Sequence, residues 1–283
     1  MGSEVQPPAL AADLSAYRYP DGTHALHELS LQVSSGSFCA VLGGNGSGKT
    51  TLLKVLDGMF RDYQGSVRLE GEEISRLTPR QIYSRMGLVF QNPDEQLFGH
   101  SVYEDVAFGP RNMGFDEPEV RRRVKAALAE MELVELERRD LHTLSYGQKK
   151  RVCIAGLLAM GHRILLLDEP SAGLDPRGER HLMELLARLN RESGVTVVMA
   201  THQVDLVPLY FDRLFLLAGG RLVLSGAPQE VLLDPVLLEA ECLRLPYVGE
   251  LFHALRSAGI SAGAPLPLTV ADGVRRLQQE CSK

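Results

Sequence analysis

The sequence has few cysteines, and none of them form a close pair. The four cysteines lie far apart in 283 residues and show no Cys-x-x-Cys spacing: Cys39, Cys153, Cys242 and Cys281. This spacing argues against both a zinc site built from cysteine pairs and a disulfide framework. We therefore expect buried or free thiols in a reducing compartment.

Long hydrophobic runs are also missing. The longest apolar runs, such as ILLL and VTVVMA, are much shorter than the roughly 20 residues that a membrane-spanning helix needs. The first ten residues, MGSEVQPPAL, have neither the basic start nor the apolar stretch of a signal peptide. We expect a cytoplasmic protein that reaches a membrane only through a partner.

The chain has no excess of basic residues. Its formal net charge is −6, whereas a nucleic-acid-binding surface usually needs a basic face. We expect no nucleic-acid partner. The length and the hydrophobic content of 45% suit one large domain with an appendage, or two small domains.

What is present predicts an α/β fold. Alternating runs around a Pro-Asp-Gly turn at residues 20–22, followed by SVRLEGEEI, predict a small antiparallel sheet near the N-terminus. Continuous apolar runs predict buried strands of a parallel sheet, and a double-glycine turn predicts a later hairpin. The strands are expected at residues 37–42, 86–90, 163–168 and 195–202, and the hairpin at 213–226.

Two regions are expected to be helical. Residues 92–160 predict a mostly helical insert, in which one amphipathic helix runs from Asp116 to Met131. Residues 1–226 are expected to form the main domain and residues 227–283 a small α-rich appendage. The apolar faces of that appendage must be covered either by the main domain or by a second subunit.

A glycine-rich segment predicts a phosphate site. Residues 43–50, GGNGSGKT, fit the pattern G-x-x-x-x-G-K-[ST] and lie between a predicted strand and a predicted helix. The glycines let several backbone N–H groups face a phosphate, and the helix N-terminus adds partial positive charge. We expect Lys49 to reach the β- and γ-phosphates of a nucleotide and the Thr50 hydroxyl to bind Mg²⁺. A merely flexible glycine loop is the alternative.

Polar side chains follow three of the predicted strands. Asp168 is expected to hold Mg²⁺, directly or through water, and Glu169 to polarise a water for attack on the γ-phosphate. An acidic turn before a proline is the alternative for this pair. His202 is expected to contact the γ-phosphate, and Gln91 to bond to Mg²⁺ or to the attacking water, because strand ends in a parallel sheet face the ligand.

Two other polar groups receive no such role. We expect Gln96 to lie at the surface. His24 and His27 lie three residues apart, and this pair alone is a weak basis for a metal site, so we predict none there.

The segment LSYGQKKR, residues 144–151, predicts a second anion site. The Ser145 hydroxyl, the Gly147 N–H and a helix N-terminus together can hold a phosphate. The next three residues are cations, and cations are unfavourable near the N-terminus of a helix. We therefore expect some of Lys149, Lys150 and Arg151 to contact a partner or the solvent.

In combination, these motifs resemble the ATP-binding cassette (ABC) ATPases of membrane transporters, which are P-loop NTPases with a RecA-like parallel sheet core. The motifs follow the order of that family over roughly residues 10–225: Tyr19, GGNGSGKT, Gln91, LSYGQ, ILLLDEP, SAGLD and His202. The usual family signature is Leu-Ser-Gly-Gly-Gln, and Tyr146 replaces its first glycine here. Four segments resemble the energy-coupling-factor importers more narrowly, especially the cobalt and nickel type: VFQNPDEQLF, DVAFGP, LSYGQKKRV and the tail with PLPLT. The vitamin importers of the same type share much of the sequence of these segments.

The resemblance implies that two cassettes pair head to tail, with each ATP between the phosphate loop of one and the signature of the other. Tyr19 would stack on adenine, with Tyr17 as a competitor, and Asp175 would bridge the subunits near the attacking water. The implied catalytic residues are Glu169, His202 and Gln91, and the Mg²⁺ ligands are Thr50, Gln91 and Asp168. The implied nucleotide contacts are Tyr19, Gly43, Asn45, Gly46, Ser47, Gly48, Lys49, Thr50, Thr51, Ser145, Gly147, Gln148 and Asp175.

The function implied is an ATPase that powers import of cobalt or nickel, or of a vitamin, at the cytoplasmic face of the cell membrane. Its partners would be a second ATPase subunit, identical or related, and integral membrane subunits that include a substrate-binding one. A soluble cassette protein of DNA repair or translation would usually have two cassettes or long coiled coils. A P-loop kinase would not need LSYGQ or SAGLD, and a GTPase would normally show an Asn-Lys-x-Asp motif.

Overall fold

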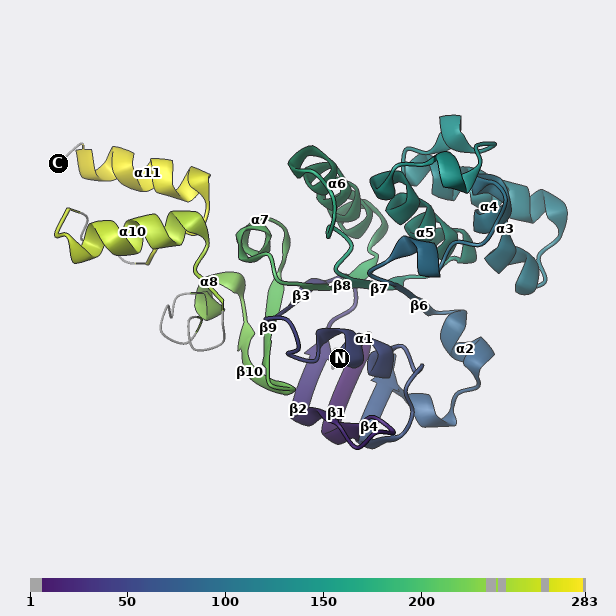
Figure 1. Ribbon diagram of the computed structural model, residues 1–283, viewed down its shortest axis with the longest axis horizontal. Coiled ribbons are helices and arrows are strands. Elements are labelled where there is room, and N and C mark those ends of the chain that lie inside the picture. Colours follow the sequence, from purple (N-terminus) through teal and green to yellow (C-terminus); the bar gives the residue numbers. More distant parts are fainter. Residues whose placement is uncertain (1–6, 233–237, 239–242, 261–264, 282–283) are drawn as a thin grey trace, which may run out of the picture.

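The computed structural model describes residues 7–232, 238, 243–260 and 265–281, which form two β-sheets, surrounding helices and a C-terminal helical hairpin (Figure 1). The strands are β1 (Leu10–Arg18), β2 (His24–Val33), β3 (Phe38–Leu42), β4 (Tyr63–Leu69), β5 (Glu72–Glu73), β6 (Met86–Val89), β7 (Ile164–Asp168), β8 (Thr196–Thr201), β9 (Arg213–Ala218) and β10 (Arg221–Gly226). The α-helices are α1 (Lys49–Leu56), α2 (Pro79–Tyr83), α3 (Val102–Asn112), α4 (Glu117–Glu130), α5 (Tyr146–Met160), α6 (Pro176–Ser193), α7 (Val207–Tyr210), α8 (Pro228–Val231), α10 (Tyr247–Ser257) and α11 (Val270–Cys281).

The smaller sheet is antiparallel in the order β2-β1-β4-β5, which confirms the predicted N-terminal sheet. The turn between β1 and β2 contains Gly22 at φ +88°, and the Asp21 carboxylate accepts a hydrogen bond from the Thr23 N–H at 2.9 Å. Such side-chain-to-backbone bonds favour turns over continued strands.

The larger sheet has the order β10-β9-β3-β8-β7-β6, in which the five strands from β9 to β6 are parallel and β10 is an antiparallel edge strand. Every residue of β3, β6, β7 and β8 is buried. Along β3, alternate side chains pack into two different hydrophobic cores, one on each face of the sheet. Val41 packs into the core with α1 and the smaller sheet, whereas Ala40 and Leu42 pack into the core with α5 and α6. Burial on both faces explains the continuous apolar runs.

The helical insert is confirmed. In it α3 and α4 both pack against α5, beside the edge of the sheet that carries β6 (Figure 1). The predicted helix from Asp116 to Met131 is α4, whose N-cap Asp116 accepts a hydrogen bond from the Glu119 N–H at 3.0 Å. The described part of the chain includes no helix that is both long and apolar enough to cross a membrane.

The C-terminal hairpin of α10 and α11 lies at the opposite end of the molecule from α3 and α4 (Figure 1). Phe252 of α10 and Leu268 before α11 are buried and join the larger core. Leu251, Val274 and Leu277 remain exposed, so one apolar face of the hairpin is uncovered. The predicted linker before α11 lies partly outside the described residues, at positions 261–264.

The described cysteine side chains agree with the predicted free thiols. Cys39 and Cys153 are buried and free. Burial raises the pKa of the Cys39 thiol to about 11 and that of Cys153 to about 12, which keeps both protonated near neutral pH. Cys242 and the side chain of Cys281 lie outside the described residues.

Candidate active site

Four neighbouring parallel strands deliver the candidate residues to one edge of the larger sheet. The loop after β3 carries residues 43–50, and Gln91 follows β6. Asp168 ends β7, and His202 follows β8. Because these strands run in the same direction and in register, their carboxyl ends meet, which is where α/β sheets bind ligands.

The glycine-rich loop is built to hold an anion. Gly48, at φ +102°, is the N-cap of α1 and has no side chain to cap it, so the first N–H groups of the helix are available to a ligand. A Cβ at Gly43 would lie only 2.3 Å from the Leu217 carbonyl oxygen, which explains the glycine there. The Lys49 Nζ donates to the carbonyls of Gly43 and Gly44 at 2.9 and 3.0 Å and so lies over the loop.

Thr50 and Asp168 offer oxygen ligands suited to Mg²⁺. The Thr50 hydroxyl donates to Oδ2 of Asp168 at 2.7 Å. Oδ1 of Asp168 is buried and, within the described residues, has no hydrogen-bond partner. Burial raises the pKa of this carboxyl, since desolvation disfavours its charged form. A hydroxyl beside a carboxylate with an unpartnered oxygen fits a small divalent cation that prefers oxygen ligands.

Glu169 lies at the centre of the polar cluster. Its Oε1 is 3.4 Å from the Lys49 Nζ, and its Oε2 is 3.2 Å from Nδ1 of His202 and 3.4 Å from Nε2 of Gln91. Its backbone has φ +44°, a conformation that non-glycine residues rarely adopt. Strained backbone of this kind is concentrated at functional sites, and a carboxylate held among these groups suits a general base.

Lys49, Thr50, Gln91 and Glu169 line a cleft of about 520 Å³, with Tyr19 on its wall, whereas the predicted Gly43, Asp168 and His202 are not among its lining residues. Tyr19 is hydrogen-bonded to the Thr51 hydroxyl at 2.8 Å. Tyr17, the competitor, is only 5% exposed and stacks on Phe60 in the core. The cleft contains these predicted residues: Tyr19, Asn45, Gly46, Ser47, Gly48, Lys49, Thr50, Thr51, Gln91 and Glu169.

The same cleft has a wall that we did not predict, made of Thr23, His24, Ala25, Gly219 and Gly220. The two hairpin turns meet because the His27 N–H donates to the Gly220 carbonyl at 2.8 Å. Their sequences show turns but contain no signal that the turns face each other. The rings of His24 and His27 are stacked, and they belong to no group of three or more potential metal ligands among the described residues.

The signature residues line a separate cleft of about 610 Å³. Ser145 caps α5. Its hydroxyl accepts from the Gln148 N–H at 3.3 Å, while the Gln148 side chain accepts from the Ser145 N–H at 2.9 Å. Gly147 and Asp175 lie on the same cleft, and Asp175 caps α6. No lining residue is common to this cleft and the cleft of the phosphate loop.

Two polar side chains are not at simple surface positions. Of the three cations that follow Gln148, Lys149 and Arg151 are partly exposed, as expected for some of them, whereas Lys150 is fully buried and its Nζ donates to the carbonyls of Phe90 and Gln91. Gln96 is not a simple surface residue. Its amide accepts from the Phe90 N–H at 3.0 Å and donates to the Leu88 carbonyl at 3.2 Å, so that it holds the end of β6.

Comparisons with known proteins identify relatives of this chain. The ABC transporter family matches residues 26–172. A putative ABC transporter ATP-binding protein of Geobacter sulfurreducens is 56% identical over 95% of this chain and 96% of its own length. The energy-coupling factor transporter ATP-binding protein EcfA of Methanosphaera stadtmanae is 44% identical over 90% of this chain and 93% of its own.

A solved structure is similar as well. CbiO1 from Clostridium perfringens, described as part of the ABC transporter complex cbiONQ, is 42% identical. It has a TM-score of 0.76, and the match covers 88% of this chain and all of that one. The nucleotide-binding architecture and these similarities together show that the chain belongs to the ABC transporter family, as one of its ATP-hydrolysing subunits.

Proposed function

We propose that this ATPase powers import of a transition-metal ion, cobalt or nickel, through an energy-coupling-factor transporter. The likeness to EcfA supports the transporter type, and the likeness to CbiO1 of the cbiONQ complex supports the metal. A vitamin importer is the alternative for the solute. The chain would work at the cytoplasmic face of the cell membrane, held there by integral membrane subunits.

The observation that carries the ATPase mechanism is the position of Glu169 among Lys49, His202 and Gln91. Lys49 binds the β- and γ-phosphates, and Glu169 takes a proton from the attacking water. His202 orients Glu169 and contacts the γ-phosphate. Thr50 and Asp168 would hold Mg²⁺, with Gln91 as the further ligand or as the contact to the water, and the cation would supply neutralisation of charge on the phosphates.

The separation of the two clefts supports a dimer. In one chain, Ser145 and Gly147 line a different cleft from Lys49 and Glu169. Two copies arranged head to tail would place each signature on the γ-phosphate of the partner's ATP and Asp175 at the boundary. A homodimer has two complete sites, and a heterodimer with a related ATPase is the alternative. The remaining nucleotide contacts proposed are Tyr19, Gly43, Asn45, Gly46, Ser47, Gly48, Thr51 and Gln148.

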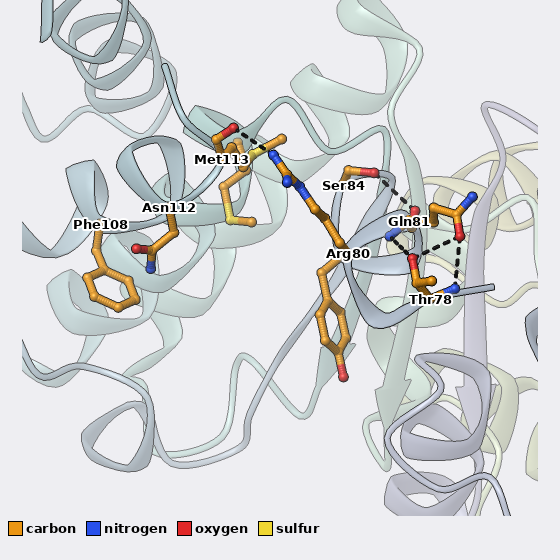
Figure 2. A pocket seen from close by; sticks show the side chains of 10 residues that line it. Thr78, Arg80, Gln81, Ser84, Phe108, Asn112 and Met113 are labelled. Carbon is orange, nitrogen blue, oxygen red and sulfur yellow. Dashed lines mark hydrogen bonds between the residues drawn. The ribbon is translucent and has the colours of Figure 1, made fainter. Parts of the chain in front are cut away.

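A groove of about 700 Å³ between α2 and α3 is the proposed docking place for a membrane subunit (Figure 2). Phe108 is 47% exposed there, and the Arg80 side chain crosses to donate to the Met113 carbonyl at 3.3 Å. Helix α2 leads directly into β6, which ends two residues before Gln91. A subunit seated in this groove would thus be linked through β6 to the γ-phosphate, and coupling between the two must be reciprocal.

We assign residues 1–226 to the ATPase domain, with its helical part at about 92–160, and residues 227–283 to a dimerisation appendage. The exposed apolar face of α11, with Leu277 44% exposed, supports this role. Leu277→Glu should weaken association in sedimentation runs without nucleotide. Unchanged association would show that the appendage is not part of the dimer contact.

The function is tested by purifying the tagged chain from its native membranes in mild detergent and identifying the co-purifying chains by mass spectrometry. Integral membrane subunits, one of them with a metal-binding N-terminus, would support the cobalt or nickel importer. A vitamin-binding membrane subunit would keep the transporter and change the solute. Recovery of soluble partners alone would contradict the transport role and leave the ATPase site intact.

A further inference from the structure

The first turns of α5 hold the loop that carries Gln91. The Lys150 Nζ donates to the carbonyl oxygens of Gln91 and, at 3.4 Å, of Phe90. The Tyr146 hydroxyl donates to the same Gln91 carbonyl at 3.1 Å. A further contact comes from Lys149, whose Nζ lies 2.6 Å from the Asp94 carboxylate. Three side chains of the signature segment therefore reach one short loop.

The burial of Lys150 shows that this contact is specific. Its side chain is 0% exposed and lies near the N-terminus of a helix, where a cation opposes the helix dipole. A buried ammonium is costly unless hydrogen bonds and nearby charge compensate it. Here the compensation comes from the two loop carbonyls and from the Tyr146 ring, whose centroid is 5.4 Å from Nζ.

Tyr146 replaces the first glycine of the usual signature, and the replacement has a structural consequence. Its ring packs close to Gly173, where an added Cβ would lie 3.2 Å from Cε1 of the tyrosine. A glycine at position 146 could not supply the ring beside Lys150 or the hydroxyl on Gln91. This chain thus has contacts between the signature helix and the Gln91 loop that the usual signature lacks.

Gln91 also faces the reacting carboxylate, because its Nε2 lies 3.4 Å from Oε2 of Glu169. One residue therefore contacts the phosphate-loop cleft through its side chain and the signature helix through its carbonyl. The signature helix begins on the other cleft, which serves the partner's nucleotide in the dimer proposed above.

We propose that Tyr146 and Lys150 are positioning residues that fix the Gln91 loop to the signature helix and so couple the two nucleotide sites of the dimer. ATP at the phosphate loop of one chain orders Gln91, and through these two side chains it orients the signature helix of the same chain toward the partner's ATP. The inference rests on the proposed dimer, and coupling of this kind must be demonstrated as an energetic effect between sites.

The test is steady-state ATP hydrolysis by the full-length chain and two variants, Tyr146→Phe and Lys150→Met. Tyr146→Phe removes one hydroxyl and keeps the ring, while Lys150→Met keeps much of the side-chain volume. We expect kcat to fall at least about fivefold in each, with the half-saturating ATP concentration changed by less than about twofold and the Hill coefficient reduced toward 1. The matched controls are Tyr63→Phe and Lys125→Met, which line neither cleft and should keep wild-type values.

The outcomes separate this inference from the dimer itself. If the wild-type chain is cooperative and Tyr146→Phe keeps its kcat and Hill coefficient, the coupling role is overturned while the dimer stands. A non-cooperative wild-type chain overturns the coupling, and sedimentation of Glu169→Gln with ATP and Mg²⁺ decides separately whether the dimer stands. Thermal unfolding of each variant identifies any that fail to fold, and Tyr146→Phe alone then decides, because it removes a single oxygen from a partly exposed side chain.

Discussion

Nδ1 of His202 lies 3.2 Å from Oε2 of Glu169, so the imidazole at the end of β8 directly contacts the carboxylate that follows β7. Removing the ring should leave Glu169 without its orienting partner while the phosphate loop still binds nucleotide. For His202→Ala we expect kcat for ATP hydrolysis to fall by about 10²-fold, with little change in KM. His100→Ala, at an exposed position outside both clefts, is the control. An equal loss of kcat in His202→Ala and His100→Ala would show that His202 has no specific role in the mechanism.

Asp168 should set the affinity for Mg²⁺. Asp168→Asn removes the charge from the carboxylate that accepts the Thr50 hydroxyl, and a neutral amide is a weaker ligand for a hard cation. We expect the Mg²⁺ concentration for half-maximal hydrolysis to rise at least about tenfold. Binding of a fluorescent ATP analogue without Mg²⁺ should persist. An unchanged Mg²⁺ titration would place the cation elsewhere.

The groove between α2 and α3 should be needed for assembly and not for hydrolysis by the isolated chain. Phe108→Glu places a charge on this half-exposed apolar side chain. We expect co-purification with the membrane subunits to fall severalfold, because burying the charge there would be costly. Leu209→Glu, at a position of α7 that is 56% exposed, is the matched control. Normal recovery of the Phe108→Glu complex would exclude the groove as the docking place.

Asp57 should make the stability of the chain depend on pH. Its Oδ1 is buried without a hydrogen-bond partner among the described residues, and burial raises its pKa to about 7 from an ordinary 3.8. Between these values the folded chain retains a proton that the unfolded chain has released. The contribution of this group to stability therefore falls as pH rises from about 4 to about 7 and is constant above that.

Asp57→Asn cannot ionise and removes this dependence. Near pH 4 we expect the free energy of unfolding of the variant to differ from that of the wild type only by a constant offset. Above pH 7 the free energy of unfolding of the variant should exceed that of the wild type by roughly 2–4 kcal/mol more than this offset. Urea unfolding at several pH values measures the difference. A difference between the two chains that is independent of pH would show that Asp57 titrates normally.

The sequence predicts the parallel strands and the loop between β3 and α1 well because both depend on local patterns. GGNGSGKT specifies a turn and a helix start, and continuous apolar runs such as ILLL specify strands buried on two faces. A short helix such as α2 was missed although its signal was present. Thr78 forms a capping box with Gln81, and Pro79 occupies the first helical position.

Other features depend on contacts between distant segments, so no local pattern could reveal them. Lys150 is 59 residues from the Gln91 carbonyl that compensates its charge, and in the sequence it is only the second of three cations. Gln96 lies in a polar segment, and only the folded end of β6 gives its amide two backbone partners. The wall of Gly219 and Gly220 in the ATP cleft likewise comes from the approach of β10 to β2.

The central claim, that two of these chains close around ATP, is tested most directly by sedimentation of Glu169→Gln with ATP and Mg²⁺. This variant should bind ATP without hydrolysing it and should therefore sediment as a stable dimer. Adding Gly147→Asp, which places a charge and a side chain at the signature, should abolish the ATP-dependent part of the association. A strict monomer for Glu169→Gln, or an ATP-dependent dimer that survives Gly147→Asp, would contradict the head-to-tail account.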